Sequence, residues 1–205
     1  MLRGLVGQAG IFLLALLVTG CSFVMAGAPT PEAAARLNSE ERGFINFRVV
    51  ATRDAPDGMI VFYTHHHPGG VEPGLGFTRP VDMFGYAVAE RVPLGWRVNQ
   101  AASSSASEVG EESLVHLGIS GSAGNTTVYG RTTALGVAAV EAHFLDGPIL
   151  RDETGDGVFR LVADNDSTLC FLRLFDEEGQ QLERRAFSRA PACAAPADET
   201  DREAS

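Results

Sequence analysis

Short segments in which apolar and polar residues alternate run from residue 44 to residue 187. In one of them the apolar Ile45, Phe47 and Val49 are two residues apart, which places them on one side of an extended strand. Turn-forming Gly, Pro, Asn and Asp residues separate the segments at intervals of roughly 8–12 residues. The pattern predicts an all-β domain over residues 44–187, and the strand spacing favours a β-sandwich.

Local patterns predict how some of these strands pair. Residues 44–64 are expected to form a hairpin, because Ala55-Pro56-Asp57-Gly58 has the residues of a tight turn. Residues 168–175 are apolar on both faces, as expected of a central strand. A turn at Glu178-Gly179 is expected to send residues 181–187 back along that strand.

The second half of the domain has a pattern-level resemblance to a known class of module. Residues 129–185 contain a strand and turn with the sequence V-E-A-H-F-L-D-G and a later turn with the sequence D-E-E-G-Q-Q-L. In these features the segment looks similar to the immunoglobulin-like modules of exported bacterial proteins. The resemblance implies an immunoglobulin-like sandwich and, because unrelated functions share that fold, no particular activity.

The N-terminus has the order of features found in export signals. Arg3 is the only charged residue among the first 31, and the apolar run IFLLALLV follows at residues 11–18. The next residues, Val18-Thr19-Gly20-Cys21, resemble a bacterial lipobox. That resemblance implies that residues 1–20 are a signal peptide removed from the chain and that Cys21 carries the lipid. The alternative is an uncleaved anchor, because residues 4–31 carry no charge and are numerous enough to span a bilayer.

The expected organisation has four parts. The signal peptide at residues 1–20 is followed by the lipidated Cys21 and a tether up to residue 43, the sandwich at residues 44–187, and a disordered acidic tail at residues 188–205. Within the tether, Thr30 and Pro31 have the residue types of a helix N-cap and first position, although so short a helix is not stable alone. The body is expected on a membrane, facing the periplasm or the cell exterior.

Charge excludes several functions. The chain has 16 basic residues, all of them Arg, and 26 acidic residues, for a formal net charge of −10. Such acidity argues against nucleic acid as a partner. The absence of Lys excludes a P-loop lysine, a Ser-x-x-Lys nucleophile and a lysine Schiff base.

The chain has three cysteines, and lipidation of Cys21 leaves Cys170 and Cys193. In an exported protein such a pair predicts a disulfide, which would pin the start of the tail against the strand at residues 168–175. The alternative is a buried free thiol at Cys170 with Cys193 unpaired.

Two short segments have residue types that bind metals. His65 and His67 would share one face of a strand and, together with Glu72 or Asp82, form a metal site; the alternative is a polar strand end. Residues 152–157 begin like a calcium loop, but position 12 is Ala163 where a bidentate Glu is needed, so a hairpin turn is favoured.

The function expected from these features is that of a membrane-anchored, non-enzymatic lipoprotein that serves as an envelope or protein-binding module. It has no cofactor except the covalent lipid, and its expected partners are the bilayer and an envelope protein. The alternative is a metal- or small-ligand-binding lipoprotein that uses the loop from His65 to Asp82. A hydrolase comes third: Glu141 and His143 can pair on one strand face, but no Gly-x-Ser-x-Gly motif occurs. An exposed cluster of Phe77, Phe84 and Tyr86 would favour partner binding.

Overall fold

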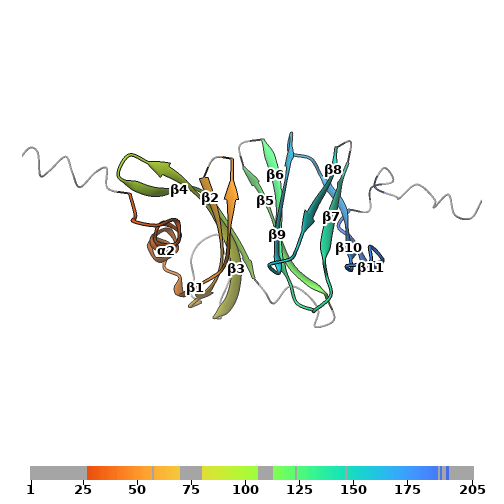
Figure 1. The fold of residues 1–205 in the computed structure, drawn as a ribbon, viewed down its shortest axis with the longest axis horizontal. Coiled ribbons are helices and arrows are strands. Elements are labelled where there is room, and N and C mark those ends of the chain that lie inside the picture. The colour runs from red at the N-terminus through yellow and green to blue at the C-terminus, as the bar shows by residue number, and fades with distance from the viewer. Residues whose placement is uncertain are drawn as a thin grey trace, which may run out of the picture.

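Three antiparallel sheets and one helix make up the described part of the chain (Figure 1). The computed structural model describes residues 27–56, 58–69, 80–105, 113–122, 124–145 and 147–188, together with residues 190 and 193. The all-β prediction is confirmed. Cys21, Glu72 and Phe77 lie outside the described residues. Within these ranges no helix has the length and hydropathy needed to cross a bilayer.

The sheets are named A, B and C. Sheet A has the strand order β1-β2-β3-β4, with bounds Ile45–Ala55, Gly58–His67, Val81–Val92 and Gly95–Ser105. Sheet B has the order β5-β6-β9, with bounds Val115–Ser122, Asn125–Thr132 and Val158–Asp164. Sheet C has the order β11-β10-β7-β8, with bounds Gln181–Ala186, Leu169–Phe175, Ala139–Phe144 and Ile149–Glu153.

Sheet A is a meander that is covered on both faces. The expected hairpin is present, since Ala55 of β1 pairs with Gly58 of β2. Alternate residues of β2 and β3 face opposite sides, and each side is apolar. One side, with Val61, Tyr63 and Ala87, packs under a helix. The other side packs against sheet B and contains Phe62, Phe84 and Tyr86.

The helix, α2 (Pro31–Glu41), covers sheet A from within the segment expected to be a tether. Its N-cap is Thr30, whose hydroxyl accepts a hydrogen bond from the Ala33 N–H at 3.1 Å. A helix of this length is marginal alone, so packing must stabilise it. Its buried residues are Ala34, Ala35 and Ser39, and residues 31–41 therefore belong to the fold.

Sheet B is the middle layer of the stack (Figure 1). At the middle of β6 and at the start of β9, neighbouring residues point to opposite sides and both are buried. Tyr129 and Val158 face sheet A, whereas Val128 and Phe159 face sheet C. Because both faces are covered there, these stretches lack the alternation of polar and apolar residues that a two-layer sandwich shows.

Sheets B and C pack face to face as a β-sandwich, and sheet A, which the sequence placed in the same domain, packs on the other side of sheet B. The core of the sandwich includes Val128, Phe144, Leu161 and Leu172. In the constant-type immunoglobulin arrangement the first, second, fourth and fifth strands share one sheet. Here the fourth strand, β8, pairs with β7 in sheet C instead. The arrangement agrees with a β-sandwich, and the relation to the immunoglobulin-like modules of exported bacterial proteins stays a prediction.

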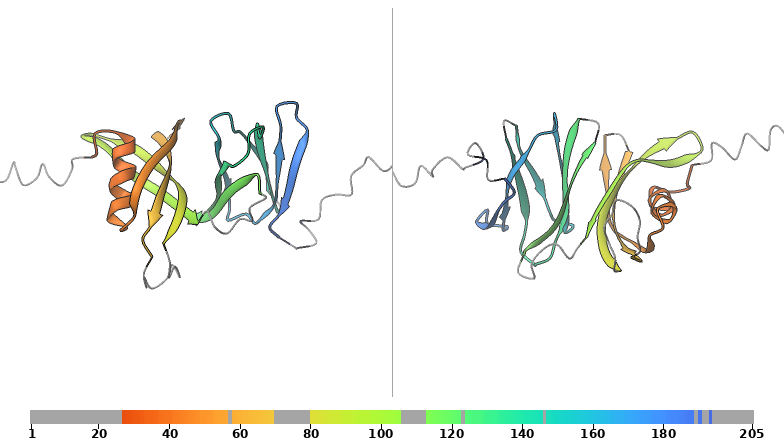
Figure 2. Two further views of the ribbon diagram at one scale, coloured as in Figure 1. Left: turned by 90° about the horizontal axis from the view of Figure 1, so that it is seen from below. Right: turned by 180° about the vertical axis from the view of Figure 1, so that it is seen from behind.

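The layers follow one another along the longest axis of the molecule, in the order α2, sheet A, sheet B and sheet C (Figures 1 and 2). The first described residues lie beside α2 at one end, and the last ones lie beside sheet C at the other. The two termini of the described chain are therefore far apart.

Candidate functional site

The histidine run ends β2 beneath α2. His65 is 3% exposed and His67 is 5% exposed, and both lie against Phe44, with ring centroids 4.0 and 5.5 Å from that of the phenyl ring. The expectation that these two side chains share a face agrees with this geometry. His66 points to the other side, where its Nδ1 lies 3.0 Å from the carboxylate of Asp82.

A buried hydrogen bond connects His65 to the helix. The Oγ atom of Ser39 in α2 lies 2.9 Å from the Nδ1 atom of His65, while the Nε2 atom is buried with no hydrogen-bond partner among the described residues. Burial lowers the pKa of His65 to about 4, and the electrostatic influence of the nearby Arg42 and His67 acts in the same direction. The imidazole is therefore neutral at neutral pH and holds α2 on sheet A.

This geometry bears on the chemistry expected of the region. The described residues contain no group of three or more His, Cys, Asp and Glu side chains placed to hold a metal ion. Glu72, the third expected ligand, is outside them. Ser39 and His65 have the residue types of a nucleophile and its base, but Ser39 is only 1% exposed and a substrate cannot reach its hydroxyl.

A cavity of about 500 Å³ opens at the same end of sheet A. His65 and Thr64 of β2, Asp82 of β3 and Arg131 of β6 contribute to its lining. Arg131 lies with its guanidinium carbon 6.0 Å from the ring centroid of Phe84, and its Nη2 is 3.4 Å from His116 Nδ1. The volume falls within the range of small-ligand sites.

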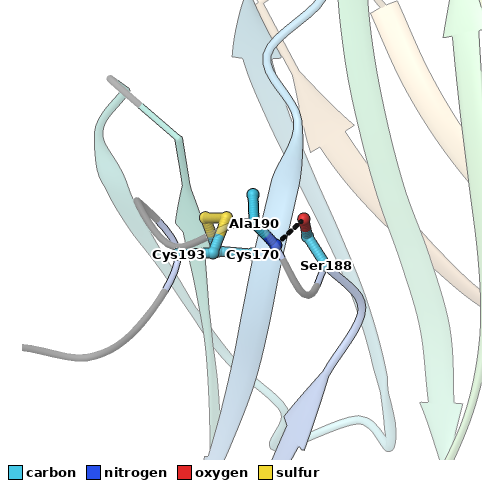
Figure 3. Close-up of a disulfide and its surroundings, with 4 residues drawn as sticks. All are labelled: Cys170, Ser188, Ala190 and Cys193. Carbon is cyan, nitrogen blue, oxygen red and sulfur yellow. Dashed lines mark hydrogen bonds between the residues drawn. A yellow bond between two sulfur atoms is a disulfide. The ribbon is translucent and has the colours of Figure 1, made fainter.

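The cysteine pair forms a disulfide, as the sequence predicted (Figure 3). The Cα atoms of Cys170 and Cys193 are 5.1 Å apart. The β10–β11 hairpin brings the chain back so that Phe187 N–H donates a hydrogen bond to the Cys170 carbonyl. Ser188 accepts a hydrogen bond from Ala190 N–H, and the segment then reaches Cys193. The start of the tail is thus fixed to sheet C beside Phe171.

The calcium-like segment has a different role from either interpretation of the sequence. Residues 154–157 do not close a hairpin, because β8 belongs to sheet C and β9 to sheet B. Asp152 of β8 and Asp156 of this connection bind Arg53 of sheet A, which donates to Asp152 at 2.8 and 2.9 Å and also to Asp156. Arg53 further donates to the Val158 carbonyl at 2.6 Å. These oxygens stabilise the contact between the layers.

Sequence reasoning missed this arginine, since 99 residues separate Arg53 from Asp152 and neither stands in a motif. Two of the three aromatic residues whose exposure would have favoured partner binding are buried. Phe84 is 1% exposed and Tyr86 is 0% exposed, so they pack between sheets A and B and form no exposed cluster.

The outer face of sheet C carries polar and aromatic side chains in contact. Phe171 lies between His143, whose ring centroid is 4.2 Å away, and the guanidinium of Arg184, whose carbon is 4.1 Å from the ring centroid. The expected pairing of Glu141 with His143 is present at 3.5 Å, and Glu141 also accepts from Arg151 at 3.1 Å.

Comparison with protein-family models, with curated proteins and with solved structures finds no match for the chain.

Proposed function

We propose that the chain is a bacterial lipoprotein, held on a bilayer by acyl chains on Cys21, with a non-enzymatic binding body that faces the periplasm or the cell exterior. The observation that carries the proposal is the disulfide between Cys170 and Cys193. Disulfides persist in oxidising compartments and are rare in the cytosol. A covalent bond of this kind supports export, and the lipobox-like sequence before Cys21 supports anchoring.

The outer face of sheet C supports a binding role. Aromatic and arginine side chains contribute most of the binding energy in protein interfaces, and on this face the exposed Arg184 lies over the ring of Phe171, which is itself buried. The large apolar side chains of Ile149 and Leu182 on the edge strands of this sheet are 62% and 45% exposed. Cys193 is bonded to this sheet through Cys170. We therefore assign the binding of an envelope protein to sheet C.

Radiolabelled palmitate supplied to the producing cells tests the anchor. The wild type should incorporate label and lose residues 1–20. The Cys21→Ala variant should remain unlabelled and unprocessed, because no thiol is available at the cleavage site. The Cys193→Ser variant is the control, since it removes a cysteine of the body and should still be labelled. Equal labelling of the Cys21→Ala variant and the wild type would refute lipidation at Cys21.

Photocrosslinking in cells tests the binding face. A photoreactive residue at position 182 on sheet C should give a discrete protein adduct. The same residue at position 135, where Leu135 is 105% exposed on the β6–β7 connection, should not give that adduct. The same adduct from both positions, or none from position 182, would remove sheet C as the binding face.

The cavity beside His65 favours a second candidate, a lipoprotein that binds a metal or small ligand between His65 and Asp82. Elemental analysis of the purified full-length protein separates the two candidates. A stoichiometric metal that is lost in the His65→Ala variant would support the second candidate. Its absence from the wild type would count against metal binding.

A further inference from the structure

The turn between β3 and β4 presents a large apolar side chain to solvent. Val92 pairs with Gly95, so that Pro93 and Leu94 make the turn, and Leu94 is 59% exposed. Trp96 lies two residues after Leu94 and is partly buried. We call residues 92–96 the hairpin tip. Its apolar end, Leu94, lies at the surface.

The N-terminal segment is fixed beside this hairpin tip. Ala28 and Trp96 exchange two backbone hydrogen bonds of 2.8 Å. The two chains approach so closely that a Cβ atom on Gly27 would lie 2.7 Å from the Trp96 nitrogen, and one on Gly95 would lie 2.4 Å from the Ala28 oxygen. The point at which the chain arrives from Cys21 is therefore held at the hairpin tip.

The chain between Cys21 and this point is short. Six residue steps separate Cys21 from Gly27, and a fully extended chain covers at most about 20 Å over that distance. If acyl chains on Cys21 lie in a bilayer, as the proposed function states and as this inference requires, the hairpin tip cannot move far from the membrane surface.

The residue types of the hairpin tip suit the boundary between lipid and water. Leucine favours the apolar side of this boundary and tryptophan is enriched at it, while arginine keeps its charge in water and its stem along the apolar surface. Arg91 lies with its guanidinium carbon 5.3 Å from the ring centroid of Trp96, and Arg97 extends from β4 with 69% of its side chain exposed.

A short tether also removes most of the entropic cost of a second contact. Two groups joined by a short linker meet at an effective concentration in the millimolar range, so a contact too weak to hold a free protein is populated in an anchored one. We propose that the hairpin tip is a second contact with the bilayer, in which Leu94 enters the lipid–water boundary and Trp96 lies beside it.

This contact orients the whole body. The hairpin tip lies at the α2 end of the molecule, and sheet C lies at the opposite end (Figures 1 and 2). With the hairpin tip on the membrane, the layers stand one above another and the outer face of sheet C points away from the lipid.

The only tryptophan of the chain is Trp96, which makes its fluorescence a native reporter. The experiment uses the full lipidated protein in phosphatidylcholine vesicles whose acyl chains carry bromine, a short-range quencher. Flotation of the vesicles first measures anchoring. In floated wild type, Trp96 emission should lie at shorter wavelength than in the protein without vesicles. Its intensity should be lower with brominated vesicles than with vesicles that lack bromine.

The Leu94→Ser variant and a matched control, Leu135→Ser, complete the test. Both variants should float, but the Leu94→Ser variant should lose most of the quenching while the Leu135→Ser variant keeps it. Wild type that floats without quenching, or a Leu94→Ser variant quenched as strongly as the wild type, would overturn the second contact and leave the anchor standing. Wild type that does not float would overturn both proposals together.

Discussion

Arg53 of sheet A donates hydrogen bonds to residues at the connection between sheets C and B, so its replacement should destabilise the contact between these layers. The Arg53→Met variant keeps most of the side-chain volume and removes the charge. It leaves the carboxylates of Asp152 and Asp156 without their cation and the Val158 carbonyl without this donor. Each carboxylate keeps one backbone donor, the N–H of Arg160 for Asp152 and that of Val158 for Asp156.

The expected loss follows from the exposure of the three side chains. Their exposed fractions are 24% for Arg53, 15% for Asp152 and 35% for Asp156. Breaking a buried ion pair costs about 3–5 kcal/mol, whereas an exposed pair is worth about 0.2–1 kcal/mol. The partly buried Arg53 cluster should lie between these limits, and we expect the free energy of unfolding to fall by about 2–3 kcal/mol.

Urea unfolding of the chain from residue 22 onwards measures this loss. With an m value of about 2–3 kcal/mol/M, the midpoint should move down by about 1 M. Trp96 fluorescence reports on sheet A and far-ultraviolet circular dichroism on all strands, so divergence of the two curves would indicate that the layers have come apart.

The control is Arg97→Met, because Arg97 forms an ion pair with Glu90 at the surface, with 69% of its side chain exposed. Its loss should be much smaller, since water and salt screen that pair. Equal losses in the Arg53→Met and Arg97→Met variants would refute the reasoning. The double variant Arg53→Met/Asp156→Asn should lose less than the two single losses combined, because both changes remove the same contact.

Three further predictions concern single sites. Burial lowers the folded-state pKa of His65 from 6.5 to about 4, so protonation of His65 opposes folding. The free energy of unfolding should therefore be unaffected by this group above pH 6.5 and should fall as the pH drops from 6.5 towards 4. Urea curves of a His65→Asn variant should show a smaller decrease over this pH range, and an equal decrease would contradict the prediction. Replacing Cys193 by Ser opens the bond to Cys170, 23 positions away, and should lower the non-reducing free energy of unfolding by about 2–4 kcal/mol; unchanged stability would argue against a stabilising bond. The Gly95→Ala variant should expose the N-terminal segment to protease, because a Cβ atom at position 95 would meet the backbone of Ala28. The Gly179→Ala variant is the control, since Gly179 also has a positive φ but has no atom within 4 Å of a Cβ atom placed there. Equal cleavage of the two variants would refute the close approach of residue 95 to the N-terminal segment.

The strands themselves could be predicted from the sequence, because the period of two is a local property of the chain. The β1–β2 and β10–β11 hairpins follow from turn residues close to the strands they join. The assignment of strands to sheets could not be predicted in this way. Glycine and acidic residues at 152–157 indicate a turn, but whether the next strand pairs with the last one or crosses to another sheet depends on residues far along the chain.

The site was predictable to a similar extent. Counting cysteines was enough to pair Cys170 with Cys193, since few partners existed. Strand alternation placed His65 and His67 on one face, but their surroundings come from Ser39 and Phe44, which precede His65 by 26 and 21 residues. Those two residues stand in no motif, so the interaction of the imidazole with α2 was not foreseen.

The middle of β6 and the start of β9 are covered on both faces, and this bears on how the chain can be divided. A gene fragment starting at residue 113 would retain both sheets of the sandwich. It would also present Tyr129, Val158 and their neighbours to water, because sheet A normally covers them. An exposed apolar surface of that kind promotes aggregation. Sheet A therefore covers an apolar surface that would otherwise make the second half of the chain aggregate. The two halves are expected to be inherited, produced and degraded as one unit.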